Sequence, residues 1–285
     1  MEPASSELQN GLQTLHLVTE KDLQRCRGRV RRLAQGLPAF DSVWLDALVE
    51  QKLLTPFQAQ LFEEKRWSEL EVNSELLLQD QTHFDRVMPV FLAIHKHEKT
   101  RFTVCRIHSR TVDSQAAKRL SDLIQRNQNH GGNASLAMDF HCDPERSTVD
   151  VISRAVTGTS LADLLVRRGR FPEQVVCAIA SIICRKLSGL PQQSLHGDLR
   201  LSNFVIDSRG RVEVLNTGIL NALMPVLNIH EELPADAYDG LAPERFDPPQ
   251  PASVASDLYA LGCLMWHLLA GRPPHLLADP LAKIA

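Results

Sequence analysis

The feature that most constrains this chain is a polar stretch that leads directly into a short apolar run. Residues 195–203 read Leu-His-Gly-Asp-Leu-Arg-Leu-Ser-Asn, and the apolar run at 204–206 follows at once. An aromatic and β-branched run of this kind predicts a short strand. His196, Asp198 and Asn203 therefore lie in a loop at the start of a strand. Taken alone, the stretch is also typical of an ordinary loop whose polar groups satisfy one another.

Three more short patterns follow in a fixed order. An apolar run ends in Asn-Thr-Gly at 216–218, Ala-Pro-Glu stands at 242–244, and Ser-Asp-Leu-Tyr-Ala-Leu-Gly at 256–262 opens a segment that predicts an apolar helix. With the loop at 195–203, these patterns match in order and spacing the catalytic loop, D-F-G, A-P-E and S-D-x-Y-x-L-G motifs of protein kinases. The chain therefore resembles the protein kinase family, in particular the bacterial-type Ser/Thr protein kinases, over residues 74–285. By this resemblance, Asp257 in the last motif would tie its helix back to the loop at 195–203.

The resemblance implies an α+β, two-lobed fold with a small antiparallel β lobe and a helical C-terminal lobe. We expect an N-terminal helical extension over 1–70, the small lobe over 71–153 and the large lobe over 154–285. Sequence periodicity predicts strands at 76–79, 87–95, 101–107, 134–141 and 148–153. It predicts helices at 113–127, 160–168 and 172–190. The family has further helices after the one near 258–270, so we expect the large lobe to be incomplete at its C-terminal end, or the chain to be part of a longer polypeptide.

The N-terminal extension carries clear helix signals. Thr19 with Asp22 approximates a capping box, and Thr55 followed by proline is typical of a helix start. A further helix is expected over 42–51, whereas the small, polar residues 1–11 are expected to be disordered. Five arginines between positions 25 and 32 indicate a solvated helix face, or alternatively a site for an anionic partner or membrane surface.

The family assigns catalytic roles to three positions of the loop. By resemblance, Asp198 would accept the proton of a substrate hydroxyl, and Asn203 would hold a magnesium ion against the phosphates. Arg200 stands where Ser/Thr kinases have a lysine that contacts the transferred phosphate. Asn216 takes the place of the D-F-G aspartate, so Asn203 and Asn216 together would form a degenerate magnesium site. A neutral amide is a poorer ligand for this cation than a carboxylate.

The nucleotide site of the family also maps onto this chain. The V-A-x-K lysine, which contacts the α- and β-phosphates, falls on Arg106, and the backbone from Arg154 to Val156 would contact adenine. The helix glutamate that pairs with this lysine falls near Ser121 or Asp122. Alternatively, Arg106 is only a strand residue whose guanidinium lies in solvent.

Other parts of the nucleotide site are missing. No glycine occurs between Gly36 and Gly131, and the segment 79–84, where the family has its glycine loop, carries bulky side chains and Asp80. Side chains there would collide with phosphates that glycine allows to approach the backbone. The arginine of the family's H-R-D motif is replaced by Gly197, which removes the usual docking point of a phosphorylated activation loop.

These losses favour a pseudokinase, which keeps the fold but acts as a signalling scaffold or allosteric interaction module without a cofactor. The alternative is a divergent, active Ser/Thr kinase that uses ATP and magnesium. A third possibility is one half of a split receptor or sensor whose activity lies in a C-terminal domain. The partner of the pseudokinase would be another protein.

Net charge and cysteine content argue against several classes of partner and site. The net charge of −3 argues against a nucleic-acid partner, and the six cysteines contain no C-x-x-C pair, which argues against a zinc site or a disulfide framework. The apolar run at 258–270 is too short to span a bilayer and includes His267, so we expect a buried helix and no membrane segment. Reduced thiols and the absence of a signal peptide favour a cytoplasmic protein.

Overall fold

Contacts within the chain define two compact units. One unit comprises residues 1–82 with 91–102, and the other comprises 83–90 with 103–285. The computed structural model describes residues 3–36, 38–83, 88–108, 113–129, 136–191, 194–226, 235–246 and 248–275.

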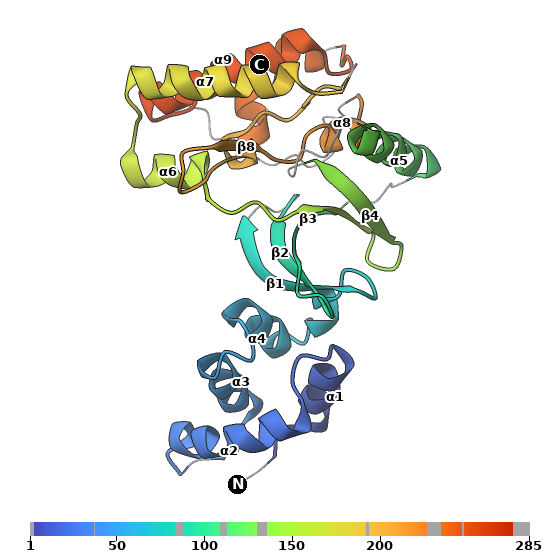
Figure 1. The fold of residues 1–285 in the computed structure, drawn as a ribbon, viewed down its shortest axis with the longest axis vertical. Coiled ribbons are helices and arrows are strands. Elements are labelled where there is room, and N and C mark those ends of the chain that lie inside the picture. The colour runs from blue at the N-terminus through green and yellow to red at the C-terminus, as the bar shows by residue number, and fades with distance from the viewer. Residues whose placement is uncertain are drawn as a thin grey trace. The chain divides into compact units, whose positions relative to one another are not determined.

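Four helices build most of the N-terminal unit (Figure 1). They are α1 (Ser6–Thr14), α2 (Glu20–Ala34), α3 (Asp41–Glu50) and α4 (Pro56–Glu63). The expected helix starts are confirmed, because Thr19 and Thr55 each form a capping box and Pro56 is the first residue of α4. The expectation that residues 1–11 are disordered is wrong for 6–11, which belong to α1, while residues 1 and 2 lie outside the described part of the chain. Ser5 caps α1, and its apolar residues Leu8 and Leu12 are buried, which stabilises a helix too short to persist alone.

Helix α4 is fixed to the first strand, β1 (Leu76–His83). The Thr55 hydroxyl donates to the carbonyl of Gln79, and the Gln58 amide donates to the carbonyl of Leu78 at 2.9 Å. The Phe57 ring packs on the Phe91 ring of β2 (Val90–His95), with centroids 5.7 Å apart. The extension therefore packs on strands of the small lobe through specific polar and aromatic contacts.

The first strand is longer than the sequence predicted. The segment 79–84 was expected to lie where the family has its phosphate loop, but residues 79–83 continue β1, and Phe84 lies outside the described residues. The absence of glycine explains the difference, because nothing in Gln-Asp-Gln-Thr-His interrupts an extended backbone.

A five-stranded sheet has the order β1-β2-β3-β5-β4, with β3 at Arg101–His108, β4 at Ala137–Asp143 and β5 at Thr148–Arg154. Strands β4 and β5 are antiparallel, with Asp143 opposite Thr148 and Phe140 opposite Val151. Helix α5 (Ser114–Asn129) packs on β4, and its Leu120 joins a core with residues of β3 and β5. This is the small antiparallel β lobe that the sequence predicted. The predicted start of β4 at 134 and 135 lies outside the described part of the chain.

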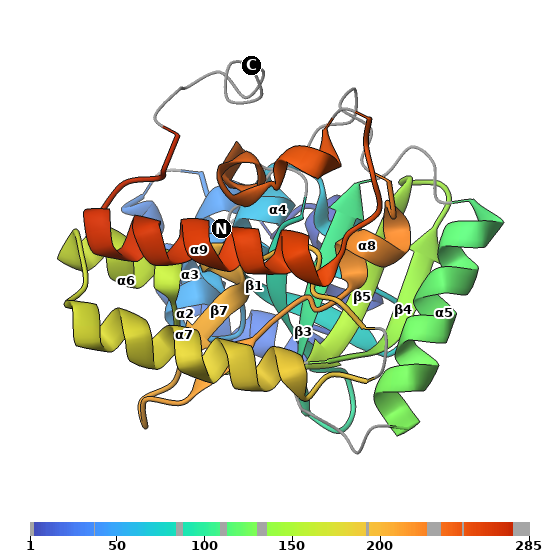
Figure 2. The ribbon, with the colours of Figure 1, turned by 90° about the horizontal axis from the view of Figure 1, so that it is seen from above.

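The helical part of the second unit surrounds a three-stranded sheet of order β6-β7-β8, formed by Thr159–Ser160, Phe204–Ile206 and Val212–Val214. Its helices are α6 (Leu161–Arg168), α7 (Glu173–Ser188), α8 (Ile219–Leu223) and α9 (Val254–Ala270), with short 3-10 turns at Leu201–Asn203, Ala235–Gly240 and Pro243–Arg245. Helices α7 and α9 lie side by side (Figure 2). Together with the small β lobe, they make the α+β, two-lobed kinase-like fold.

Helix α9 is buried on one face only. Leu261, Leu264 and Leu268 join the core of the helical part, whereas Leu258 and Trp266 are 59% and 50% exposed. The prediction of a buried helix is therefore confirmed for one face of α9 and wrong for the other, which no described element covers. Within the described part of the chain, no helix is long and apolar enough to cross a membrane.

Candidate functional site

The loop at 195–203 is held in place by the first turn of α9. The Asp257 carboxylate, itself buried, accepts hydrogen bonds from the backbone N–H groups of His196 and Gly197, both at 2.9 Å. Charge-assisted bonds to two successive amides fix the loop backbone more firmly than neutral bonds would. The expected link between the S-D-x-Y-x-L-G motif and the loop is thus confirmed.

His196 connects the loop to the end of β8. Its ring is fully buried, with Nε2 donating to the Leu215 carbonyl at 3.0 Å and Nδ1 accepting from the Asp198 backbone N–H at 3.2 Å. The ring stacks on Phe204 of β7. Burial lowers the pKa of His196, because its cationic form would lose hydration that the neighbouring carboxylates only partly replace. The ring therefore works as a neutral hydrogen-bonding bridge.

Gly197 is required by both its backbone and its surroundings. Its φ of +74° lies in the left-handed region, and a Cβ built on it would come within 3.0 Å of the Asn221 Cβ on α8. The family's arginine at this position would therefore need a different backbone conformation and a displaced α8.

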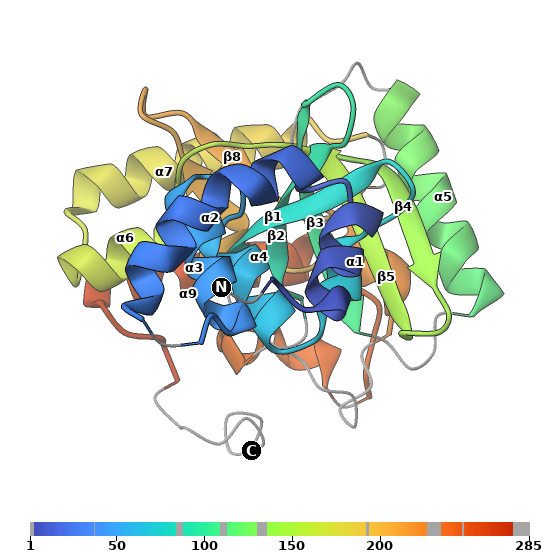
Figure 3. The same ribbon diagram turned by 90° about the horizontal axis from the view of Figure 1, so that it is seen from below.

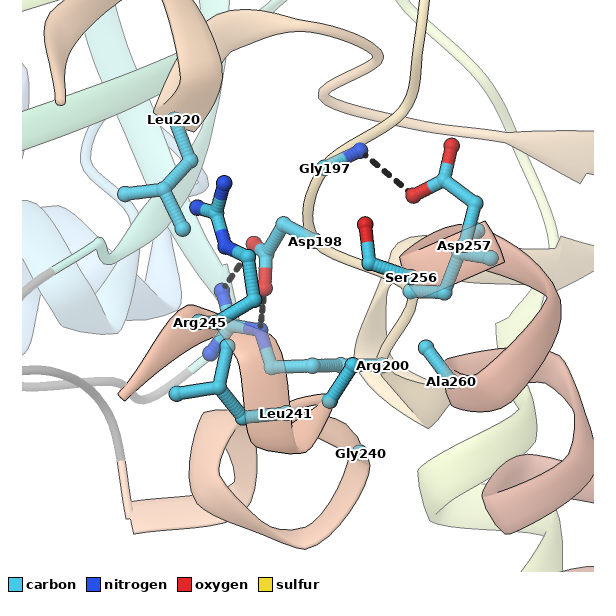
Figure 4. A pocket seen from close by; sticks show the side chains of 12 residues that line it. Gly197, Asp198, Arg200, Leu220, Gly240, Leu241, Arg245, Ser256, Asp257 and Ala260 are labelled. Carbon is cyan, nitrogen blue, oxygen red and sulfur yellow. Dashed lines mark hydrogen bonds and ion pairs between the residues drawn. The ribbon is translucent and has the colours of Figure 1, made fainter. Parts of the chain in front are cut away.

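Asp198 and Arg200 form a buried ion pair (Figure 4). Arg200 Nε lies 2.8 Å from Asp198 Oδ1, and Arg200 Nη2 donates to Asp198 Oδ2 at 2.9 Å. Asn203 Nδ2 also donates to Oδ2, at 3.0 Å, and to the Asp198 carbonyl at 2.8 Å. The side chains of Arg200 and Asp198 are only 4% and 3% exposed. Both oxygens of this carboxylate thus already face donors of the loop, and its charge is offset by the guanidinium.

The two asparagines of the expected metal site lie in contact with each other. Asn216 Nδ2 donates to Asn203 Oδ1 at 2.9 Å, and Asn216 has a left-handed φ of +58°. The Asn203 oxygen that would face a magnesium ion is therefore already used. Among the described residues, no group of three or more His, Cys, Asp or Glu side chains could hold a metal. In this arrangement, the two amides do not fit a hard divalent cation that requires several oxygen ligands.

Arg106 of β3 pairs with a residue that sequence reasoning did not identify. Its Nε and Nη2 donate to the two oxygens of Asp150 on β5, each at 2.7 Å, and the two side chains are 5% and 3% exposed. The interpretation of Arg106 as a solvent-exposed strand residue is wrong. Neither residue at the position of the family's helix glutamate serves as its partner, since Ser121 and Asp122 are exposed on α5 and the guanidinium is paired across the sheet.

A signal for Asp150 was present in the sequence. It lies between Val149 and Val151, in a run whose neighbours are all apolar or β-branched, and a carboxylate inside such a strand requires a buried partner. Which cation would supply that partner depended on the order of strands in the sheet.

A family model described as the protein kinase domain matches residues 87–282. The chain belongs to the protein kinase family. It is 30% identical to "Serine/threonine-protein kinases PknA" of Corynebacterium glutamicum over 44% of this chain and 26% of that protein. It is also 30% identical to "Mitogen-activated protein kinase kinase 1" of Arabidopsis thaliana over 45% of this chain and 36% of that protein.

A third relative is "Serine/threonine-protein kinase PknB" of Mycobacterium leprae, which is 25% identical over 46% of this chain and 21% of that protein. The matched part of the chain thus spans well under half the length of each of these relatives. The activity of kinase relatives implies the use of ATP and magnesium. Arg106, Arg200 and Asn216 are therefore significant, because each replaces a residue that the family uses to contact phosphate or magnesium.

The kinase hinge is expected at the end of β5, and the structure places Arg154 as the last residue of that strand, with Val156 in the link to β6. Arg154 is exposed and Val156 is half-buried. The link lies close to β7, since a Cβ added to Gly158 would be 2.5 Å from the Ile206 carbonyl oxygen. Adenine recognition by this backbone remains a proposal.

Arg245 is a buried cation that sequence reasoning missed. It follows the kinase A-P-E motif, is 2% exposed, and donates through Nη1 to the carbonyls of Pro225 and Gln250 at 3.3 and 3.2 Å. Burial lowers the pKa of this guanidinium. With Asp198 and Arg200, it lines a void of about 30 Å³ (Figure 4), room for about one water molecule. Pro225 lies within the segment 216–244 that corresponds to the kinase activation segment, and Gln250 follows it, so Arg245 connects a point inside that segment to the chain just after it.

Proposed function

We propose that this kinase domain has lost phosphoryl transfer and acts as a pseudokinase, a signalling scaffold or allosteric module that binds another protein. One observation carries the proposal: the two charged groups that an active kinase directs at its substrates are both neutralised in buried ion pairs. Arg106 is paired with Asp150, and Asp198 is paired with Arg200.

The pair between Arg106 and Asp150 opposes nucleotide binding. To reach a phosphate, the guanidinium would have to leave a carboxylate that is almost fully buried. Breaking such a pair costs about 3–5 kcal/mol, because the remaining charge is left without compensation. An energy of this size corresponds to a loss of roughly 10² to 10³-fold or more in affinity for the triphosphate.

The changes at the metal site and at the general base would lower the rate of phosphoryl transfer as well. Each missing charge-stabilising contact costs about 10²-fold in rate, so two losses would lower a typical kinase turnover of ~1–100 s⁻¹ by roughly 10⁴. The occupied amide oxygen of Asn203 and the paired Asp198 are two such losses. The simplest consequence is a function that needs no cofactor. Adenosine could still be recognised by the backbone of Arg154 to Val156, because that recognition needs neither the metal nor the general base.

The exposed face of α9 supports an interaction role. Val254, Leu258, Trp266 and Leu269 leave large apolar surface exposed on this helix, and contiguous surface of this kind is typical of association sites. We propose a protein partner, a cytoplasmic setting, and a division into the extension at 1–70 and two lobes at 71–153 and 154–285.

The alternative is a divergent Ser/Thr kinase. It is favoured by one observation, that Asp198 and Asn203 share one site and are hydrogen bonded to each other, in a chain whose relatives are named as Ser/Thr kinases. This enzyme would need Arg200 to turn from Asp198 towards the transferred phosphate.

Two measurements separate these functions. Titration calorimetry should show ATP binding that does not strengthen with magnesium and adenosine binding at least as tightly as ATP. A radiolabel transfer assay with a generic acceptor protein should show no labelling by the wild-type chain or by Asn216→Asp. Micromolar ATP binding that strengthens with magnesium, with labelling abolished by Asp198→Ala, would refute the pseudokinase proposal and establish the alternative.

A further inference from the structure

The N-terminal unit contains a cavity of about 590 Å³ that is unrelated to the kinase motifs. It lies where the end of α1, the connection from α3 to α4, and the turn between β2 and β3 come together. These elements are best seen from the side shown in Figure 3. The volume falls within the ~300–1,000 Å³ range of small-molecule sites in proteins. Its apolar lining includes Leu15, Leu54, Leu77 and Ile94.

The other part of the lining is basic. His16, Lys52, Lys96, His97 and Lys99 contribute to it, and no aspartate or glutamate does so among the described residues. Lys96 is paired with Glu71, so its charge is offset. Lys52 and Lys99 are exposed residues of the lining, and within the described chain neither forms an ion pair, so no carboxylate offsets these two charges.

The backbone gives a second reason to connect these residues. His16, Lys52 and Lys99 have φ values of +53°, +59° and +59°, in the left-handed region that favours glycine or asparagine. A cation at the end of α3 also interacts favourably with the helix dipole, which accounts in part for Lys52. Lys99 lies in a β-turn, where no helix dipole acts. Three separate turns therefore place basic side chains, instead of glycine, around one cavity.

We propose that this cavity binds a small amphiphilic anion, a carboxylate or phosphate monoester joined to an apolar body. The apolar body would contact the leucine and isoleucine side chains of the lining, and the anionic group would lie between Lys52 and Lys99. A ligand of this class satisfies both halves of the lining, whereas inorganic phosphate or a neutral hydrocarbon satisfies only one.

Calorimetry on the full chain tests the site with four probes of matched size: octyl phosphate, octanoate, octanol and octyltrimethylammonium. Binding of octyl phosphate or octanoate well above that of octanol is expected, together with weakening of the anions alone as ionic strength rises. The stronger of the two anions identifies the headgroup as phosphate or carboxylate. Octanol binding as tightly as the anions, or no anion binding below millimolar concentration, would overturn the proposal.

Charge-removing variants locate the site. The double variant Lys52→Gln with Lys99→Gln should bind the anion roughly ten-fold more weakly. Glutamine is compatible with the left-handed backbone, since Gln35 adopts φ +48° in this chain. Lys65→Gln is the matched control, because Lys65 is exposed, has φ +59° and does not line the cavity. Thermal unfolding should be the same for all three proteins. Undiminished binding by the double variant, or an equal loss in Lys65→Gln, would contradict the assignment.

Discussion

Replacement of Asp150 by leucine tests the ion pair that the proposed function depends on. The substitution removes two charge-assisted bonds of 2.7 Å and leaves the Arg106 guanidinium in a setting where its side chain is only 5% exposed. A cation stripped of its carboxylate in such a place destabilises a protein by about 3–5 kcal/mol. For a unit of this size, each kcal/mol lowers the midpoint of thermal unfolding by ~2–4 °C, so we expect a shift of roughly 6–20 °C.

The assay is a double-mutant cycle by urea and thermal denaturation of the full chain. Asp150→Leu and Arg106→Met should each be strongly destabilising, whereas the double variant should recover most of the loss, since apolar residues often replace a buried ion pair at little cost. Asp122→Leu is the control, because Asp122 is an exposed aspartate on α5, near the position of the family's helix glutamate.

Two outcomes would refute this reasoning. If Asp150→Leu cost less than about 1 kcal/mol, the pair would resemble an exposed surface bridge and could yield to phosphate. If Asp122→Leu were the more destabilising variant, the guanidinium would be paired with the helix, as in an active kinase, and the pair with Asp150 could not carry the proposed function.

Three further predictions concern the loop and the extension. Asp257→Asn should destabilise the chain by roughly 1–3 kcal/mol in urea, because an amide offers one oxygen to the two N–H groups of the loop; an effect no larger than that of Asp122→Asn would contradict it. Thr55→Ala should cost more than the ~1 kcal/mol expected for Thr19→Ala, because Thr55 also donates to β1; equal costs would show that the bond to β1 contributes nothing. Burial lowers the pKa of His196 below 6.5, so the unfolded chain binds a proton that the folded chain excludes. The free energy of unfolding should therefore fall as the pH drops below about 6.5, and a flat profile would contradict a neutral, buried ring.

Local signals in the sequence predicted local structure well. The capping boxes at Thr19 and Thr55 involve residues three positions apart, so the sequence alone contains all of their partners. The order of the kinase motifs predicted the two-lobed fold and the contact between Asp257 and the loop, because the family carries that long-range information. Sequence reasoning failed at α1, where burial of Leu8 and Leu12 stabilises a helix whose composition indicated disorder.

The ionic partners could not be predicted in the same way. Asp150 lies 44 residues from Arg106, and the two meet only because β5 is placed beside β3 in the sheet. Arg245 likewise contacts the carbonyls of Pro225 and Gln250, a geometry set by tertiary packing. For Asp150 the sequence showed a carboxylate between apolar residues, which indicates a buried partner but does not identify it, whereas Arg245 stands among charged residues and carried no such signal.

The two arginines at kinase lysine positions share one physical explanation. Lysine is a compact charge that makes single contacts and can turn towards a phosphate, whereas the planar guanidinium fits both oxygens of a carboxylate at once. Arg106 makes such a two-point contact with Asp150, and Arg200 makes one with Asp198. Each exchange of lysine for arginine therefore turns a charge that a kinase uses for its substrate into an internal contact. Under the proposed loss of phosphoryl transfer, no selection for nucleotide chemistry would oppose these pairs, and both would serve to stabilise the fold.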